Sequence, residues 1–183
     1  MNEQKWDTGK LDNGERSALK RDAGVMMGNN LQALEAFYRA VAYVPKAQEK
    51  EEQWYACICM ECLWKPEDHP RIMKLEEMLR KLYQNSETSD SIKHRVIALL
   101  DVPWSRDGYL LGKLNSFARM MRAKDSSVMP DFNDLADDLA AWNHPDRYIQ
   151  RRWIKTICGS TKEQIEAEPQ NNKNEMEEKE NAD

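Results

Sequence analysis

The segment at residues 130–158 constrains the fold more than any other part of the sequence, because its apolar residues recur at helical spacing. In its first half they follow steps of three, four and three residues: Phe132, Leu135, Leu139 and Trp142. Asp131 stands where an aspartate side chain caps the first turn of a helix. The pattern therefore predicts a helix that buries one face and ends near Asn143.

The second half of the same segment predicts another helix, with two different faces. Pro145 marks its start, because proline suits the first position of a helix. The apolar face recurs every four residues, at Ile149, Trp153 and Ile157. The basic face recurs at the same spacing on roughly the opposite side, at Arg147, Arg151 and Lys155, with Arg152 between the two. A row of fixed positive charges favours binding to a phosphate backbone over a catalytic role.

Most of the remaining chain repeats this helical periodicity and has few alternating β-branched runs. After a turn at 11–14, a short helix is expected through Arg21. Further helices are expected at 30–44, 49–64, 92–100 and 109–122, and a helix restarts at Pro70 and extends past Leu82. Among the side chains expected to point inward are Leu31, Tyr38 and Ile72. Loops are expected at 24–28 and 124–129. Composition and period together predict an all-α protein.

The polar run at 84–90 contains no apolar residue and is the best internal boundary in the chain. It divides an N-terminal part, 1–86, from a C-terminal part, 87–160. Residues 161–183 are predicted to form an acidic disordered tail. From residue 162 onward lie eight of the 32 acidic residues but only three of the 27 basic ones, so the rest of the chain is neutral. The net charge of −5 therefore does not exclude a nucleic-acid partner.

Candidate catalytic and metal groups give weak patterns. Cys57, Cys59 and Cys62 do not have the spacing of a zinc knuckle, and buried cysteines are common in cores. Asp134 and Asp138 share a helix face and are able to hold Mg²⁺ beside a phosphate, but a solvated face is the simpler interpretation. No Walker, G-x-G-x-x-G or H-E-x-x-H motif occurs. We therefore expect no enzyme, no metal and no cofactor, and a metal-dependent enzyme is the third hypothesis.

Basic residues recur opposite apolar stripes in several predicted helices. They are Arg16, Lys20 and Arg21 near the N-terminus, Arg119 and Arg122 in the 109–122 helix, and the set at 147–155. The repeated placement of basic residues opposite apolar stripes favours a binding surface. Nothing resembles a recognition helix or a zinc finger, so sequence-specific readout is not implied.

Several short motifs follow one another along the chain. The turn at 11–14 precedes Ala18-Leu19-Lys20-Arg21, and Ala36-Phe37-Tyr38-Arg39 comes next. Arg95 precedes the apolar pair Leu99-Leu100. The 131–142 segment fits the pattern D-W/F-x-x-L-x-x-D-L-x-x-W, and Trp153 lies in the last predicted helix. In this order and spacing the motifs resemble the CasB family, the small subunit of the type I-E CRISPR surveillance complex Cascade, and the resemblance spans roughly residues 6–157.

The sequence departs from the family at one position. The family usually carries arginine after the leucine in the middle of the 109–122 helix, whereas here Leu114 is followed by Asn115 and Ser116. If that nucleic-acid contact is kept, Lys113 or Arg119 must supply it.

The resemblance implies two small helical bundles and a non-enzymatic role without a cofactor. Two copies would lie beside the guide RNA and target DNA, among the other Cascade subunits, and would hold the displaced DNA strand to stabilise the R-loop. Guide pairing reads the sequence, so the protein needs only to neutralise backbone. The implied contact residues are Arg16, Lys20, Arg21, Arg95, Lys113, Arg119, Arg122, Arg147, Arg151, Arg152 and Lys155.

An all-helical protein-interaction adaptor, whose charges only solvate the surface, is the alternative hypothesis. The N-terminal residues lack an apolar stretch of signal-peptide length, and no stretch approaches a membrane span. We expect a cytoplasmic protein with no membrane partner.

Overall fold

The computed structural model describes residues 5–28, 30–41, 48–85 and 87–159. Its helices are α1 (Asn13–Arg21), α2 (Leu31–Ala40), α3 (Gln48–Glu61), α4 (Leu75–Gln84), α5 (Asp90–Leu99), α6 (Tyr109–Lys124), α7 (Phe132–Ala140) and α8 (Tyr148–Cys158), with short 3-10 helices η1 (Thr8–Lys10) and η2 (Pro66–Asp68). Two short strands are β1 (Arg71–Met73) and β2 (Val128–Pro130). The prediction of an all-α fold is confirmed. None of the described helices is long and apolar enough to cross a membrane.

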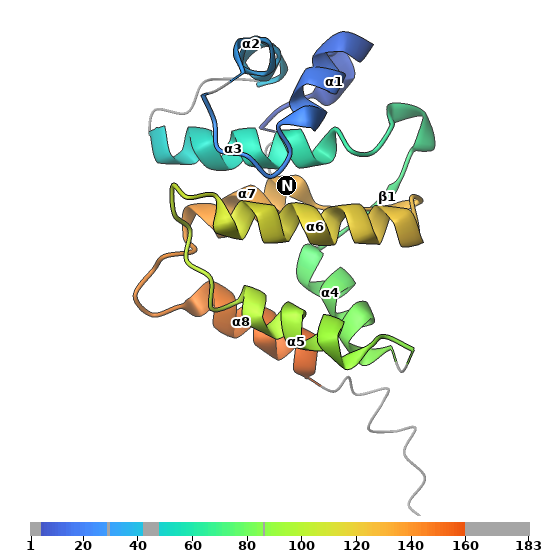
Figure 1. Ribbon diagram of the computed structural model, residues 1–183, viewed down its shortest axis with the longest axis vertical. Helices are drawn as coiled ribbons and strands as arrows, with labels where there is room; N and C mark the ends of the chain where they lie inside the picture. The colour runs from blue at the N-terminus through green and yellow to red at the C-terminus, as the bar shows by residue number, and fades with distance from the viewer. Residues whose placement is uncertain (1–4, 29, 42–47, 86, 160–183) are drawn as a thin grey trace, which may run out of the picture.

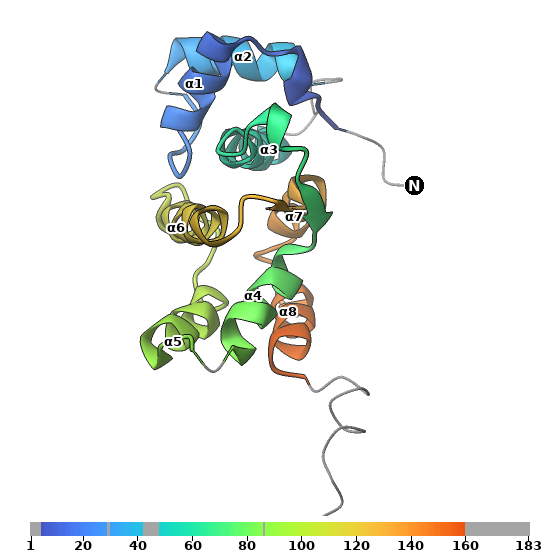
Figure 2. The ribbon, with the colours of Figure 1, turned by 90° about the vertical axis from the view of Figure 1, so that its right-hand side faces the viewer.

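The helices lie in three tiers (Figures 1 and 2). Helices α1 and α2 cover α3, the pair α6 and α7 forms the middle tier, and α4, α5 and α8 form the third. The most extensive helix packing is between α3 and α7, between α4 and α8, and between α1 and α2. The middle tier therefore joins the first helices of the chain to the last.

Helix α3 lies between the pair α1 and α2 and the pair α6 and α7 (Figures 1 and 2). All residues from Gln53 to Met60 are buried, so this helix has no solvated face in its second half. Cys57, Cys59 and Cys62 are buried in this core as free thiols. Burial raises the pKa of all three thiols, that of Cys62 to about 12. Inert, protonated thiols agree with the prediction that these cysteines fill the core.

The α7–α8 pair confirms the strongest sequence pattern. The predicted apolar residues are all buried: Phe132, Leu135 and Leu139 in α7, Trp142 in the turn just after it, and Ile149, Trp153 and Ile157 in α8. The rings of Trp142 and Trp153 meet edge to face with centroids 5.2 Å apart, an arrangement that adds about 1 kcal/mol beyond burial. Helix α8 begins at Tyr148 rather than at Pro145, because Arg147 takes a left-handed backbone conformation with φ of 49°.

The expectation of a helix restarting at Pro70 is wrong over its first residues. The strand β1 runs parallel to β2 and pairs Arg71 with Val128 and Met73 with Pro130. Ile72 is therefore 52% exposed instead of pointing inward. The same pairing places a strand at the end of the loop expected at 124–129. Local periodicity does not reveal a pairing between segments so far apart in the sequence.

Two inward positions expected in α2 are also wrong. Leu31 is 77% exposed and Tyr38 is 42% exposed. The buried face consists of small residues around one aromatic ring: Ala33, Ala36, Phe37 and Ala40. Small side chains let α2 approach α1 closely, which turns the larger residues outward. Residues 42–44 of the expected helix lie outside the described residues.

The proposed boundary at 84–90 stays a prediction, as does the division into bundles at 1–86 and 87–160. Helix α4 precedes this run, yet it packs against α8 and α5. A division that follows packing would place α4 with the C-terminal helices. The tail at 161–183 lies outside the described residues.

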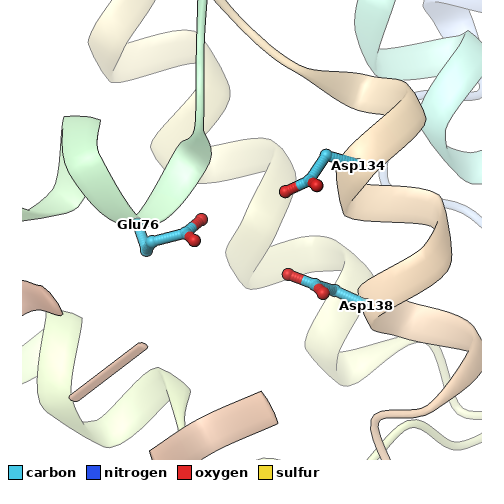
Figure 3. A group of neighbouring side chains, drawn as sticks. All are labelled: Glu76, Asp134 and Asp138. Atoms are coloured by element: carbon cyan, nitrogen blue, oxygen red, sulfur yellow. The ribbon is translucent and has the colours of Figure 1, made fainter. Parts of the chain in front are cut away.

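A buried acidic cluster joins α4, α7 and α8. Glu76, Asp134 and Asp138 point toward one another across the gap between α4 and α7 (Figure 3). Arg152 from α8 pairs with Asp138 and lies 3.5 Å from Glu76. The indole Nε1 of Trp153 donates to Asp138 Oδ2 at 2.8 Å. Burial raises the pKa of Glu76 and of Asp138 above their usual values of 4.5 and 3.8, despite the nearby guanidinium.

These raised pKa values predict a pH-dependent stability. A carboxyl group with a higher pKa in the folded state binds protons more tightly there, so its contribution to stability falls as pH rises through that pKa. We expect wild type to gain stability relative to Glu76→Gln as pH falls from about 7 toward 4.5, by at most about 1.4 kcal/mol per pH unit. Urea unfolding across this range measures the difference, with Glu77→Gln on the exposed face of α4 as control. If the free energies of unfolding of wild type and Glu76→Gln change with pH in parallel, the prediction is wrong.

Candidate nucleic-acid interface

Three of the basic residues implied by the resemblance are bonded inside the molecule. Arg16 donates to the backbone oxygens of Thr8 at 3.0 Å and Trp64 at 2.8 Å, which ties the N-terminal segment to the end of α3. Arg147 donates to the backbone oxygen of Leu100 at 2.7 Å and to Asp101 at 2.9 Å. Arg152 pairs with the acidic cluster described above. The observed contacts of these three side chains hold segments of this chain together.

A second group of these residues is brought together by Asn115 on α6. The Nδ2 atom of Asn115 donates to the backbone oxygen of Ala23 at 2.8 Å, just beyond the end of α1. Its Oδ1 atom accepts from Nε of Arg119 at 3.2 Å. The amide therefore docks the last turn of α1, which carries Lys20 and Arg21, beside α6. All three basic residues of this group are exposed.

Helix α5 completes this surface. The Nη2 atom of the exposed Arg95 donates to Oγ of Ser116 at 3.3 Å, and the guanidinium carbon of Arg95 lies 5.8 Å from the ring centroid of Phe117. Lys113 places its Nζ atom 4.6 Å from the ring centroid of Tyr109. We call the surface formed by Lys20, Arg21, Arg95, Lys113 and Arg119 the α6 face. Figures 1 and 2 show α1, α6 and α5 following one another along one side of the molecule.

Charge is segregated between neighbouring helices. Helix α6 contains four basic residues and no acidic one: Lys113, Arg119, Arg122 and Lys124. Helix α7 contains three acidic residues and no basic one, and each acid has an internal cation. Asp134 lies 3.2 Å from Lys74, Asp137 lies 2.9 Å from Lys5, and Asp138 pairs with Arg152. Within the described part of the chain, no carboxylate lies within ion-pair distance of the α6 cations.

The remaining predicted residues lie beside or apart from the α6 face. Arg122 is half-buried, and its Nε atom has no hydrogen-bond partner among the described residues. Arg151 and Lys155 are exposed on α8, as the sequence predicts. Arg151 and Ile97 line a cleft of about 350 Å³ between α8 and α5. The row expected at 147–155 is therefore reduced to two cations without an acidic partner among the described residues.

The acidic cluster is the one group of potential metal ligands found among the described residues, with ligand atoms within 4.8 Å of one another. Two cations already occupy it, since Arg152 contacts Asp138 and Glu76 while Lys74 contacts Asp134. A divalent ion would have to displace both. The residues present therefore fit an internal ion-pair network better than a metal centre.

Sequence reasoning missed two residues of this surface. In the sequence, Asn115 stands out only as a departure from the family pattern, whereas in the structure its amide orients two elements of the face. The sequence places Tyr109 at the start of a helix and gives it no role, whereas in the structure it is 59% exposed beside Lys113. The spacing of four residues between Tyr109 and Lys113 was the available signal, because such pairs meet on a helix surface.

The fold and the α6 face define a mostly helical protein that presents cations free of acidic partners among its described residues. Residues 15–156 match the family described as CRISPR-associated protein Cse2, and the chain belongs to this family. A relative of the same description from Thermus thermophilus is 26% identical over 132 residues, covering 68% of this chain and 71% of the relative. The family predicted from the sequence motifs is thereby confirmed.

Solved structures agree with this assignment. The crystal structure of CasB from Thermus thermophilus matches with a TM-score of 0.60 and 26% identity, over 80% of this chain and 86% of that chain. A chain in a structure described as a CRISPR RNA-guided surveillance complex matches with a TM-score of 0.62 and 22% identity, over 80% of this chain and 82% of the other. Because the identity of this second match is only 22%, it shows a shared fold alone.

The contact between Asn115 and α1 depends on a glycine, which gives a testable prediction. Gly24 has φ of 89°, and a Cβ atom there would lie 2.7 Å from Nδ2 of Asn115. Gly28 has φ of 123°, but a Cβ atom there would meet no other atom within 4 Å. We expect Gly24→Ala to lower the free energy of unfolding by about 1 kcal/mol or more beyond the loss in Gly28→Ala, because only Gly24→Ala adds overpacking to backbone strain. Chemical denaturation compares the two, and equal losses would count against this docking contact.

Proposed function

We propose that this protein is the non-catalytic small subunit of a type I-E CRISPR Cascade complex, and that it holds nucleic-acid backbone to stabilise the R-loop. Its membership of the Cse2 family supports the subunit role. The observation that carries the binding role is the α6 face, where cations gather without carboxylate partners among the described residues. Such cations keep their charge available for phosphate, and phosphate contacts dominate the affinity of proteins for nucleic acid.

The geometry of the α6 face suits backbone contact without sequence readout. Its long side chains come from the end of α1, from α5 and along α6, so they follow a surface rather than form a helix that enters a groove. Guide pairing would supply the sequence specificity, as in effector complexes that leave the reading of the target to RNA. The displaced DNA strand and the guide–target duplex are the proposed partners of this surface.

A non-enzymatic role agrees with the placement of the reactive side chains. The three histidines, His69, His94 and His144, are exposed and lie in different parts of the chain. The buried thiols are held protonated, as their raised pKa values show. The acids of α7 are bonded to cations. A binding role uses the charges that remain, namely those of the α6 face and of Arg151 and Lys155.

The adaptor hypothesis is supported by an apolar cleft of about 140 Å³. Its lining includes Met73, Met78, Leu82, Met121 and Val128, from four different elements. Methionine-rich clefts accept varied partner surfaces. Within the proposed function, this cleft offers a place for another Cascade subunit or for a second copy of this chain, while the α6 face contacts nucleic acid.

The salt dependence of binding tests the α6 face. Each phosphate contact with a single strand contributes about 0.7 to the slope of log affinity against log salt. We expect the double variant Lys113→Gln/Arg119→Gln to lower the slope for single-stranded DNA by about 1.4 if both side chains contact phosphate. Fluorescence anisotropy across a salt series measures it, for the free protein and for the assembled complex.

The matched control is Lys50→Gln/Lys65→Gln, which removes the same charge from exposed positions outside the α6 face. It should leave the slope nearly unchanged. If both double variants bind like wild type and the complex forms an R-loop of unchanged stability, the α6 face is a solvated surface and the adaptor hypothesis is favoured.

A further inference from the structure

Tyr109 is an exposed aromatic ring at one end of the α6 face, and the backbone contacts proposed above do not use it. Its side chain is 59% exposed, and Nζ of Lys113 lies 4.6 Å from its ring centroid. The other exposed tyrosines have different partners, since Tyr38 donates to Glu51 and Tyr148 packs edge to face on His144, whereas the Tyr109 ring contacts a cation of the α6 face. Within the described residues, no hydrogen bond to the Tyr109 hydroxyl occurs.

The backbone below Tyr109 is held firmly. Oδ1 of Asp107 accepts from the backbone N–H of Tyr109 at 2.9 Å and from Oγ of Ser105 at 2.5 Å. Gly108 takes the left-handed conformation with φ of 71°, which suits glycine. Because the backbone is already fixed, only the side-chain torsions of Tyr109 remain to be ordered when a ligand covers the ring, which favours a preorganised contact.

We propose that Tyr109 is a stacking platform for an unpaired base of single-stranded DNA, the backbone of which runs along α6 past Lys113 to Arg119. This inference rests on the proposed function, because it assumes that the α6 face holds DNA. The stretch from Tyr109 to Arg119 spans about 15 Å of helix. One aromatic ring followed by cations along a surface is the combination with which proteins bind single strands without sequence preference.

The platform would give the α6 face a preference that charge alone does not supply. Lysine and arginine attract the phosphates of a duplex and of a single strand alike. In a duplex, the base faces are covered by their neighbours, so none is free to stack on Tyr109. An unpaired base offers its π-face to the ring, and every base has one. The side chain would therefore select the displaced strand over double-stranded DNA.

The test compares Tyr109→Leu with Tyr109→Phe on three DNA probes: a single strand, the same strand with abasic sites, and a duplex. We expect Tyr109→Leu to bind the normal single strand about tenfold more weakly than wild type, and Tyr109→Phe to bind it like wild type. Neither variant should differ from wild type on the abasic strand or the duplex. The salt slope should stay unchanged, because neither substitution removes a charge.

The outcomes separate this proposal from the one on which it rests. If Tyr109→Leu binds the normal strand as tightly as wild type while Lys113→Gln/Arg119→Gln binds weakly, stacking is wrong and backbone binding stands. An equal loss on the abasic strand would also overturn stacking, since no base is present there. Tighter binding of single-stranded RNA than of DNA would overturn the choice of the displaced strand. If wild type binds no probe, free or in the assembled complex, both proposals fall.

Discussion

The arrangement of the helices depends on Asp138 and the groups bonded to it. This carboxylate accepts from the indole of Trp153 and pairs with Arg152, so a single residue of α7 holds two consecutive residues of α8. Arg152 reaches Glu76 as well, which adds α4 to the junction. A buried charge is costly unless it is paired and hydrogen-bonded, and here both conditions are met for Asp138 by two residues of α8. Because α7 also packs against α3, the junction links the last helices of the chain to the first.

The acidic and the basic residues of the described helices have different surroundings. The acids of α7 are engaged by Lys5, Lys74 and Arg152, whereas the cations of α6 have no carboxylate within ion-pair distance among the described residues. Internal ion pairs thus divide the charges of the chain into a set that holds the fold and a set that faces solvent. A count over the whole sequence hides this division, because a net charge of −5 averages both sets together.

Much of the fold was predictable because apolar periodicity reports burial directly. The stripes of α7 and α8 were expected residue by residue, and their side chains are buried. The errors occur where contacts between distant parts of the chain determine which side chains are buried. The pairing of β1 with β2 turned Ile72 outward, and packing on alanines turned Leu31 outward. The candidate site was also predicted only in part. The sequence places Arg16, Arg147 and Arg152 on a basic surface. Their hydrogen bonds and ion pairs with distant backbone oxygens and carboxylates cannot be predicted from the local spacing of residues.

Asn115 shows how a departure from a family pattern can be structurally consistent. The resemblance to the family leads one to expect arginine here, a side chain that only donates hydrogen bonds. An asparagine amide both donates and accepts, and Asn115 uses both functions, toward Ala23 and toward Arg119. Arg119 is therefore oriented by the residue that stands in place of the family arginine. Of the two residues expected to take over the contact, Arg119 gains its position from Asn115, whereas Lys113 lies over Tyr109 at the other end of the face. The guanidinium of Arg119 stands about one helical turn after Asn115, and the amide of Asn115 holds it near the end of α1.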